Sequence, residues 1–319
     1  RTPTKAKFDT GVGQFSPEGD IPQIQYAHEA VKKGALIVGV ECKDGAILVC
    51  EKRTHSPLML EQGGIDKINV VHDGLAAALA GLLPDGRLAV QRARQLAQEH
   101  WFMYNEPIGA FKVVAGLAEL ALGFNRYSNR NGERDRDEED GGVARLSRPL
   151  GLGLLLAGPV MEEASGRDQS GRPKVGIYHL EPSGVHLRWR AKALGQGATE
   201  LEALMERGAI PQYQGASSGE KQPVTQEQVQ RLCDGSLTMS EAARALIPLL
   251  ADQLMGGSGQ PPGKGNQEKD KHYGQHHTVA EDNEEMDHQR RLARRLEIVF
   301  VSNETGIRKL SDEEIIEFI

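Results

Sequence analysis

The chain has 319 residues, of which 39% are hydrophobic, and this length suits one large domain or two small ones with a sizeable buried core. Its formal net charge of −7 disfavours a phosphate-binding surface, so we do not expect a nucleic acid partner. No apolar run reaches the roughly 18 residues that a membrane-spanning helix requires, and no membrane association is expected.

Cysteine usage and the N-terminal segment favour a reducing compartment. The three cysteines, Cys42, Cys50 and Cys233, have a spacing that matches no metal site. No apolar signal segment precedes the first motif. We therefore expect reduced, partly buried thiols in a protein of the cytoplasm or nucleus.

A tight turn at Phe15–Gly19 is predicted to lead into a helix over about residues 22–33. Pro17 fixes its own φ and Gly19 tolerates a positive φ, as such turns require. Gly34 is a typical residue to end the helix. The apolar residues that recur at helical spacing are Ile24, Ala27 and Val31.

A hairpin is predicted over residues 36–51. Asp44 and Gly45 lie between two apolar runs, and an Asp-Gly pair supplies the positive φ angles of a tight turn between antiparallel strands. The chain therefore begins with a turn, a helix, a glycine and then a pair of strands.

Apolar periodicity and turn residues place the later elements. Capping boxes, formed by Thr238 with Glu241 and by Ser311 with Glu314, open two of the helices. Strands are expected at 65–70, 75–79, 150–157, 175–180, 185–190 and 296–301. Helices are expected at 85–104, 110–122, 198–207, 238–254 and after Ser311.

The order of these elements indicates the fold class. Strands come in hairpins and helices in pairs, unlike the strict alternation of a doubly wound fold, so we predict an α+β fold with two antiparallel sheets between helix layers. Three polar or Gly-rich segments, at about 126–145, 208–234 and 256–289, have little apolar surface to bury. We expect a single domain over residues 1–319 that carries them as loop insertions.

The N-terminal motifs resemble those of a known family. The turn Phe15–Gly19 and the helix Gln25–Gly34 resemble the signature of the alpha-type subunits of the 20S proteasome, which carry a near-identical FSPEG turn and a YAxEAxKxG helix. The resemblance covers roughly residues 8–319 apart from the insertions, and it implies the four-layer αββα sandwich of the N-terminal nucleophile hydrolases. Further matches are His100–Glu106 and Ser56–Met59, which look most like the type-5 member, and Arg148–Gly151 and Glu181–Gly184.

The resemblance implies a structural and regulatory subunit rather than an enzyme. In this family a ring of seven alpha subunits templates the catalytic beta subunits and gates substrate entry for ubiquitin-dependent and ubiquitin-independent protein degradation. The implied partners are neighbouring alpha and beta subunits and the C-terminal tails of activators. Catalytic members of the fold need a Thr hydroxyl at the head of the first strand and a freed α-amine as its base. Ala35 stands at that position here, so no catalytic residue and no cofactor are expected.

An activator pocket is implied around Lys67. The family places this lysine between neighbouring alpha subunits, where it resembles a point charge that awaits the C-terminal carboxylate of an activator tail. Gly81 and Leu82 are its expected neighbours. His28 stands where some relatives have Arg, and this exchange would make the positive charge depend on pH.

A gate is implied nearer the N-terminus. Relatives use a Tyr-Asp pair, the turn proline and the helix tyrosine to hold N-terminal tails over the axial pore. The matching residues are Phe8, Asp9, Pro17 and Tyr26. Phe8 lacks the phenolic hydroxyl and cannot donate the hydrogen bond that Tyr would make, and simple aromatic packing remains an alternative role for Phe8 and Tyr26.

Two other functions remain open at this point. A free-standing amidohydrolase of the same fold would need a nucleophile where Ala35 stands. A divergent paralogue that acts as an assembly factor outside the particle is compatible with Phe8, Thr10 and the long insertions. No metal site is expected from a group of histidines whose spacing fits no standard set of ligands, namely His272, His276, His277 and His288.

Overall fold

A computed structural model of the chain describes residues 13–53, 58, 66–123, 146–161, 173–207, 231–232, 234–256, 286, 289–302 and 304–318. Its strands are β1 (Ile37–Glu41), β2 (Ala46–Glu51), β3 (Ile68–His72), β4 (Leu75–Gly81), β5 (Leu152–Pro159), β6 (Val175–Leu180), β7 (His186–Trp189), β8 (Ala191–Leu194), β9 (Leu296–Ser302) and β10 (Gly306–Lys309). Its helices are α1 (Pro22–Lys32), α2 (Leu83–Tyr104), α3 (Ala110–Ala121), α5 (Ala198–Arg207), α7 (Met239–Gly256) and α9 (Asp312–Phe318).

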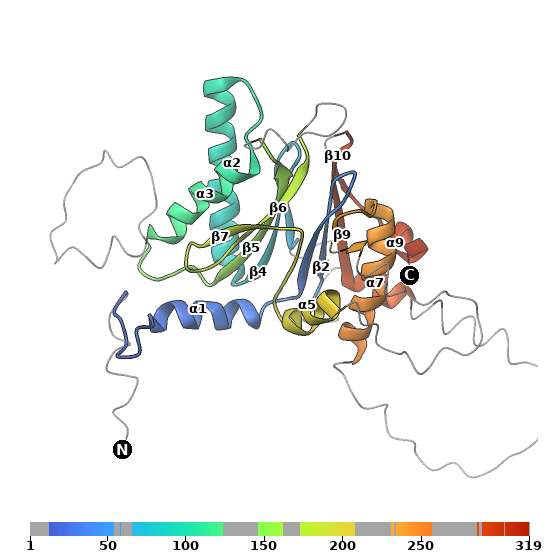
Figure 1. Ribbon diagram of the computed structural model, residues 1–319, viewed down its shortest axis with the longest axis horizontal. Coiled ribbons are helices and arrows are strands. Elements are labelled where there is room, and N and C mark those ends of the chain that lie inside the picture. Colours follow the sequence, from blue (N-terminus) through green and yellow to red (C-terminus); the bar gives the residue numbers. More distant parts are fainter. Residues whose placement is uncertain are drawn as a thin grey trace, which may run out of the picture.

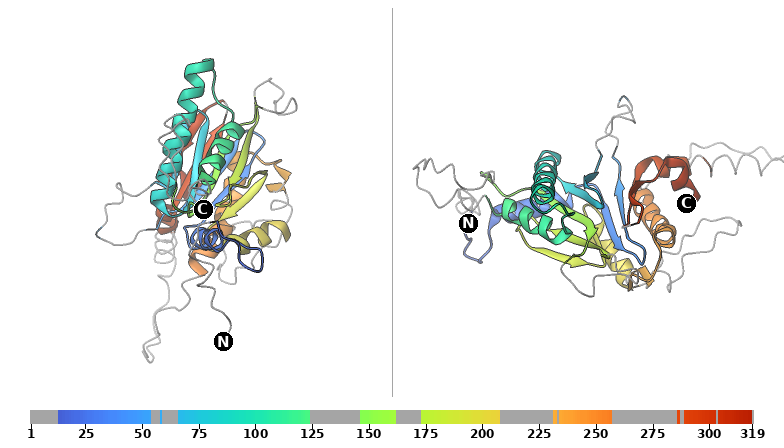
Figure 2. Two further views of the ribbon diagram at one scale, coloured as in Figure 1. Left: turned by 90° about the vertical axis from the view of Figure 1, so that its left-hand side faces the viewer. Right: turned by 90° about the horizontal axis from the view of Figure 1, so that it is seen from above.

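Two antiparallel sheets of five strands lie face to face between two layers of helices (Figure 1). One sheet has the order β10-β9-β2-β1-β8 and the other the order β3-β4-β5-β6-β7. Helices α2 and α3 cover the outer face of the second sheet, and α5, α7 and α9 lie against the first, as the view from above in Figure 2 also shows. The predicted α+β sandwich of two sheets between helix layers is confirmed.

Buried apolar side chains fill each interface between these layers. One cluster lies between the two sheets, a second under α2 and α3, and a third under α5, α7 and α9. All eight residues of the central strand β5 are buried, because both of its faces are covered, and its unbroken apolar run predicted this. Burying each Leu or Ile side chain stabilises the fold by about 1.5–3 kcal/mol.

Most predicted elements agree with the observed ones to within about three residues. Both capping boxes are present: the Glu241 carboxylate accepts the Thr238 backbone N–H at 2.9 Å, and Glu314 accepts that of Ser311 at 2.9 Å. Two short edge strands, β8 and β10, were not predicted, because half or more of their residues are partly or fully exposed and show no apolar run. The predicted insertions fall almost entirely outside the described residues, and they stay predictions.

The hairpin of β1 and β2 is confirmed, with Ile37 opposite Cys50 and Glu41 opposite Ala46. Its predicted cause is wrong, since neither Asp44 nor Gly45 has a positive φ. A Cβ on Gly45 would overlap the carbonyl oxygen of Val301 in β9 and lie 2.9 Å from the sulfur of Met239. The Asp44 carboxylate accepts the backbone N–H of Met239, the first residue of α7, at 2.8 Å. This Asp-Gly pair therefore serves tertiary packing and helix capping rather than turn geometry.

We expect Gly45→Ala to lower the free energy of unfolding by about 3 kcal/mol, because the new methyl group has to push β9 away. The control is Gly74→Ala, whose Cβ would meet open space at a φ of +75° and should cost about 1 kcal/mol of backbone strain. Urea denaturation of the purified chain measures both. Equal losses in the two variants would contradict the packing role of Gly45.

Candidate functional site

The C-terminal end of α1 lies directly against the end of β4, and glycines permit this contact. A Cβ on Gly34 would overlap the backbone nitrogen of Gly81 and lie 2.9 Å from the carbonyl oxygen of Val31. Gly81 has a φ of +109°, and its own Cβ would overlap the carbonyl oxygen of Gly151. That same oxygen accepts the backbone N–H of Leu82 at 2.8 Å. Three backbone segments therefore meet without side chains between them.

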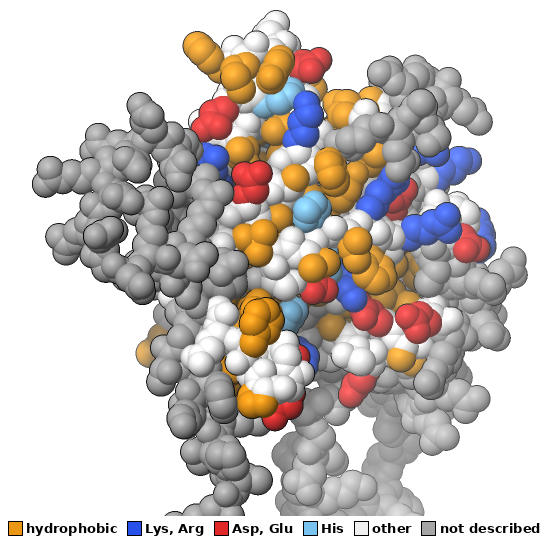
Figure 3. Space-filling model, turned by 60° about the vertical axis from the view of Figure 1, so that its left-hand side comes forward, with side chains coloured by type: hydrophobic (Ala, Val, Ile, Leu, Met, Phe, Trp, Pro, Cys, Tyr) orange, Lys and Arg blue, Asp and Glu red, His pale blue; other side chains and the backbone are white. Residues whose placement is uncertain are grey.

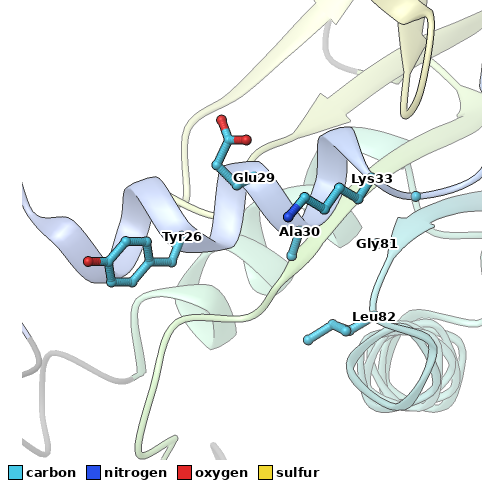
Figure 4. A pocket seen from close by; sticks show the side chains of 7 residues that line it. Tyr26, Glu29, Ala30, Lys33, Gly81 and Leu82 are labelled. Carbon is cyan, nitrogen blue, oxygen red and sulfur yellow. The ribbon is translucent and has the colours of Figure 1, made fainter.

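A pocket of about 460 Å³ lies in the angle between α1 and the turn from β4 to α2, and we call it the α1 pocket (Figure 4). Half of the Tyr26 side chain is exposed there, and Leu82 is exposed to a similar extent. The α1 residues lie at helical spacing on one face of the helix. The lining residues are Tyr26, Glu29, Ala30, Lys33, Gly34, Gly81 and Leu82.

A buried carboxylate fixes the side of the α1 pocket that Gly81 and Leu82 form. Asp85, in the first turn of α2, accepts hydrogen bonds from both terminal nitrogens of Arg148 at 2.7 and 2.9 Å. It also accepts the backbone N–H of Gly151 at 2.9 Å. Burial opposes ionisation of Asp85, but the hydrogen bonds and the charge of Arg148 outweigh it and hold its pKa below the ordinary value. This ion pair ties the segment before β5 to the start of α2.

A second group of polar contacts fixes the end of α1. Arg53 donates hydrogen bonds to the Lys33 carbonyl at 3.4 Å and to the Gln196 side chain at 3.1 Å. It also pairs with the buried Glu51 carboxylate at 2.9 Å. The backbone N–H of Gln196 donates to the Gly34 carbonyl at 3.0 Å. Hydrogen bonds from Arg53 and from Gln196 therefore fix the C-terminal end of α1.

Lys67 directly precedes β3 and does not line the α1 pocket. Its backbone N–H donates to the Glu297 carboxylate at 3.1 Å, and its carbonyl accepts the N–H of Leu79 at 3.1 Å. Lys309 of β10 forms ion pairs with Glu297 at 2.7 Å and with Asp66 at 2.9 Å. These ion pairs attach the segment before β3 to the first sheet. The Lys67 side chain is half-buried and has no ion pair with the carboxylates of the described segments.

The other predicted site residues are dispersed. His28 is half-buried on α1 and outside the lining of the pocket. Burial, together with the positive charges of Lys192 and His28, lowers the pKa of the nearby His179 to about 4. Pro17 is exposed in the turn before α1. Phe8 and Asp9 lie outside the described residues. The structure thus brings Tyr26, Gly81 and Leu82 together, while the roles assigned to all these residues stay predictions.

Sequence reasoning missed four of the lining residues, namely Glu29, Ala30, Lys33 and Gly34. The available signal for the first three was their spacing of three, four and seven residues from Tyr26, which places them on the same face of a helix. The approach of Gly81 and Leu82 to that face depends on tertiary packing, and no local pattern indicates it.

No helix within the described ranges is long and apolar enough to cross a membrane. Nor do three or more His, Cys, Asp or Glu side chains gather there in a way that would hold a metal ion. Burial and the nearby charge of Asp44 raise the pKa of the Cys42 thiol to about 12, so this thiol stays protonated. Cys233 and the four histidines singled out in the sequence lie outside those ranges.

Comparison with known proteins places the chain in a family. A family model described as "Proteasome subunit" matches residues 31–132. The "Probable proteasome subunit alpha type-5" of Schizosaccharomyces pombe (strain 972 / ATCC 24843) is 38% identical over 195 residues, which are 61% of this chain and 70% of that protein. The "Proteasome subunit alpha type-5" of Dictyostelium discoideum is 38% identical over 203 residues, with coverage of 64% and 73%.

The "Proteasome subunit alpha" of Thermococcus sibiricus (strain DSM 12597 / MM 739) is 36% identical over 204 residues, 64% of this chain and 67% of that protein. The chain therefore belongs to the proteasome family, as an alpha-type subunit of the 20S core. Within the alpha type its similarity is to type-5 subunits, which confirms the resemblance inferred from the sequence motifs.

We expect Asp85→Asn to lower the free energy of unfolding at pH 7 by about 2 kcal/mol, a value moderated by the partial exposure of Arg148. Because the folded-state pKa of Asp85 is depressed, its contribution is present above the ordinary carboxyl pKa of about 4 and is lost as the pH falls further.

The difference between wild type and Asp85→Asn should therefore shrink between pH 7 and pH 3 in urea denaturation. The control is Asp73→Asn at an exposed position, which should change stability by at most about 0.5 kcal/mol. A difference that stays constant down to pH 3 would show that the charge of Asp85 contributes nothing to the free energy of unfolding.

Proposed function

We propose that this chain is a non-catalytic subunit of the alpha ring, which templates the assembly of the catalytic beta subunits and gates the entry of protein substrates. One observation carries the non-catalytic role. Ala35 stands where a catalytic member of the fold needs a nucleophile, and the chain leads into it from α1, so residue 35 has neither a hydroxyl nor a free α-amine. The neighbouring carbonyl of Gly34 accepts the backbone N–H of Gln196 at 3.0 Å.

The projecting end of α2 supports a role in an assembly. Trp101, Phe102, Met103 and Tyr104 are exposed there, and Phe102 is 90% exposed. The C-terminal end of α2 lies at the top of the molecule in Figure 1, and hydrophobic side chains gather at the top of the view in Figure 3. Interfaces are enriched in aromatic residues and Met, and monomers rarely leave such a patch uncovered. We infer that another subunit covers it.

We propose that activator tails dock between this chain and a neighbouring alpha subunit. The backbone of Lys67 is held by Glu297, and its side chain forms no ion pair with a carboxylate of the described residues, which suits a point charge for a C-terminal carboxylate. Gly81 and Leu82 line the α1 pocket but Lys67 does not. A binding site shared by two subunits accommodates both observations.

The N-terminal segment is proposed to act as the gate, with Phe8, Asp9, Pro17 and Tyr26 as its cluster. Tyr26 lies on the face of α1 that lines the pocket, so a docked tail and the gate would share one residue. This arrangement couples activator docking to gate position. We place the protein in the cytoplasm and nucleus, where ubiquitin-dependent and ubiquitin-independent degradation would use it.

Capture of the chain from its native cells tests the assembly. We expect wild type to co-sediment with other alpha and beta subunits, and Phe102→Glu to lose them because a carboxylate would have to be buried in the interface. Phe102→Leu keeps an apolar side chain and should retain the partners. Isolation of the wild-type chain without beta subunits would favour the assembly-factor alternative.

Lys67→Ala should weaken activator binding by about tenfold while the particle stays assembled, since one charge-assisted hydrogen bond is lost. The control is Lys174→Ala, which removes an exposed positive charge on the chain just before β6. Binding of a purified activator to the captured particle, followed by surface plasmon resonance, gives both affinities. Equal affinities for the two variants would contradict the docking role of Lys67.

A further inference from the structure

We propose that His100 is a positioning residue for the exposed side chains at the end of α2, which its neutral ring holds in place and its protonated ring releases. The inference rests on the assembly function proposed above, in which another subunit covers those side chains. It adds a control of that contact by pH. The side chains concerned, here called the α2 patch, are Trp101, Phe102, Met103 and Tyr104.

The chain reverses direction directly after the α2 patch. Asn105, the C-cap residue of α2, has a φ of 53°, which lies in the left-handed region, and its N–H donates to the Trp101 carbonyl at 2.8 Å. A few residues later the buried side chains of Ile108 and Ala110 anchor the start of α3. The direction of the last turn of α2 therefore depends on what connects it to this reversal and to α3.

His100 makes that connection. It is only 7% exposed. Its Nδ1 lies 3.2 Å from the carbonyl oxygen of Glu106 in the reversal, and its Nε2 lies 3.3 Å from the Nζ of Lys112 in α3. An ammonium group can only donate, so Nε2 is the acceptor and Nδ1 carries the proton that is donated to Glu106. The neutral ring therefore binds α2 to both the reversal and α3.

The same contacts continue into the α2 patch. The ring centroids of His100 and Tyr104 are 4.7 Å apart. The Lys112 ammonium lies 5.9 Å from the centroid of the Tyr104 ring, within the range of a cation–π contact. Because Lys112 contacts both His100 and Tyr104, displacement of Lys112 also removes a contact that orients the patch.

A proton on Nε2 is incompatible with this arrangement. Histidine is the side chain whose charge most commonly changes between pH 8 and pH 5. Once protonated, Nε2 would turn an N–H and a positive charge toward the Lys112 ammonium, which lies 3.3 Å away. The bond from Nδ1 to the Glu106 carbonyl can persist in either state. Acid therefore acts on the contact between His100 and Lys112, and through Lys112 on Tyr104.

Other titratable groups lie close to this contact. On α2 itself, Glu99 is exposed and pairs with Arg92 at 3.5 Å. On β3, the ring of His72 lies against Trp101, with the centroids 5.9 Å apart, so a second histidine borders the α2 patch. An effect of His72 would not require Lys112, and a substitution of Lys112 separates the two.

The test captures the full chain with the subunits that accompany it and follows their dissociation at pH 7.5 and at pH 5.5. We expect wild type to release its partners about tenfold faster at pH 5.5. His100→Gln keeps a donor and an acceptor but takes up no proton, and Lys112→Gln can donate to the neutral ring and accept from the protonated one. Both variants should release their partners at nearly the same rate at the two pH values.

His186→Gln is the control, because Nδ1 of His186 also lies 3.2 Å from a backbone carbonyl oxygen, that of Gly184. It should show the pH dependence of wild type. If Lys112→Gln keeps that dependence, or if wild type has none, the role of His100 is overturned and the assembly function stands. Lys112 is exposed, so this variant decides the test even where His100→Gln fails to fold. If wild type brings down no other subunit at pH 7.5, both the assembly function and the role of His100 are overturned.

Discussion

The architecture around the α1 pocket depends on one close backbone contact, where the end of α1 meets the end of β4. Any side chain at Gly34 or Gly81 would overlap neighbouring backbone atoms, so the helix can approach the sheet this closely only because both positions are glycine. The contact determines where α1 lies relative to the second sheet. It also places the exposed face of α1, with Tyr26 and Lys33, next to Leu82 at the start of α2.

Ion pairs between distant segments keep this contact rigid. Asp85 binds Arg148 and thereby holds the strand-leading segment beside α2, while Glu51 binds both Arg53 and Arg295 and secures the end of α1 against the first sheet. Both carboxylates are almost completely buried, so the loss of Arg148 would leave the charge of Asp85 without compensation, whereas Glu51 would keep one of its two arginine partners if the other were lost. The surface side chains that we assign to recognition therefore project from backbone segments whose positions these ion pairs fix.

Much of this molecule could be predicted from the sequence, because long apolar runs and helical periodicity survive in its central elements. The unbroken run of β5 and the glycine after α1 are examples of such local signals. The edge strands β8 and β10 escaped prediction because their side chains are only partly buried. The packing role of Gly45 and the approach of Leu82 to α1 both arise from segments far apart in the chain, and no local pattern carries that information. The gate residues Phe8 and Asp9 came from family resemblance alone.

The central claim is that this chain works as a structural member of a larger particle, and native mass spectrometry of endogenous complexes captured through the chain tests it most directly. The account predicts a particle that contains alpha and beta subunits together, with this chain present in two copies. Recovery of only the free chain, or of a small complex without beta subunits, would contradict it.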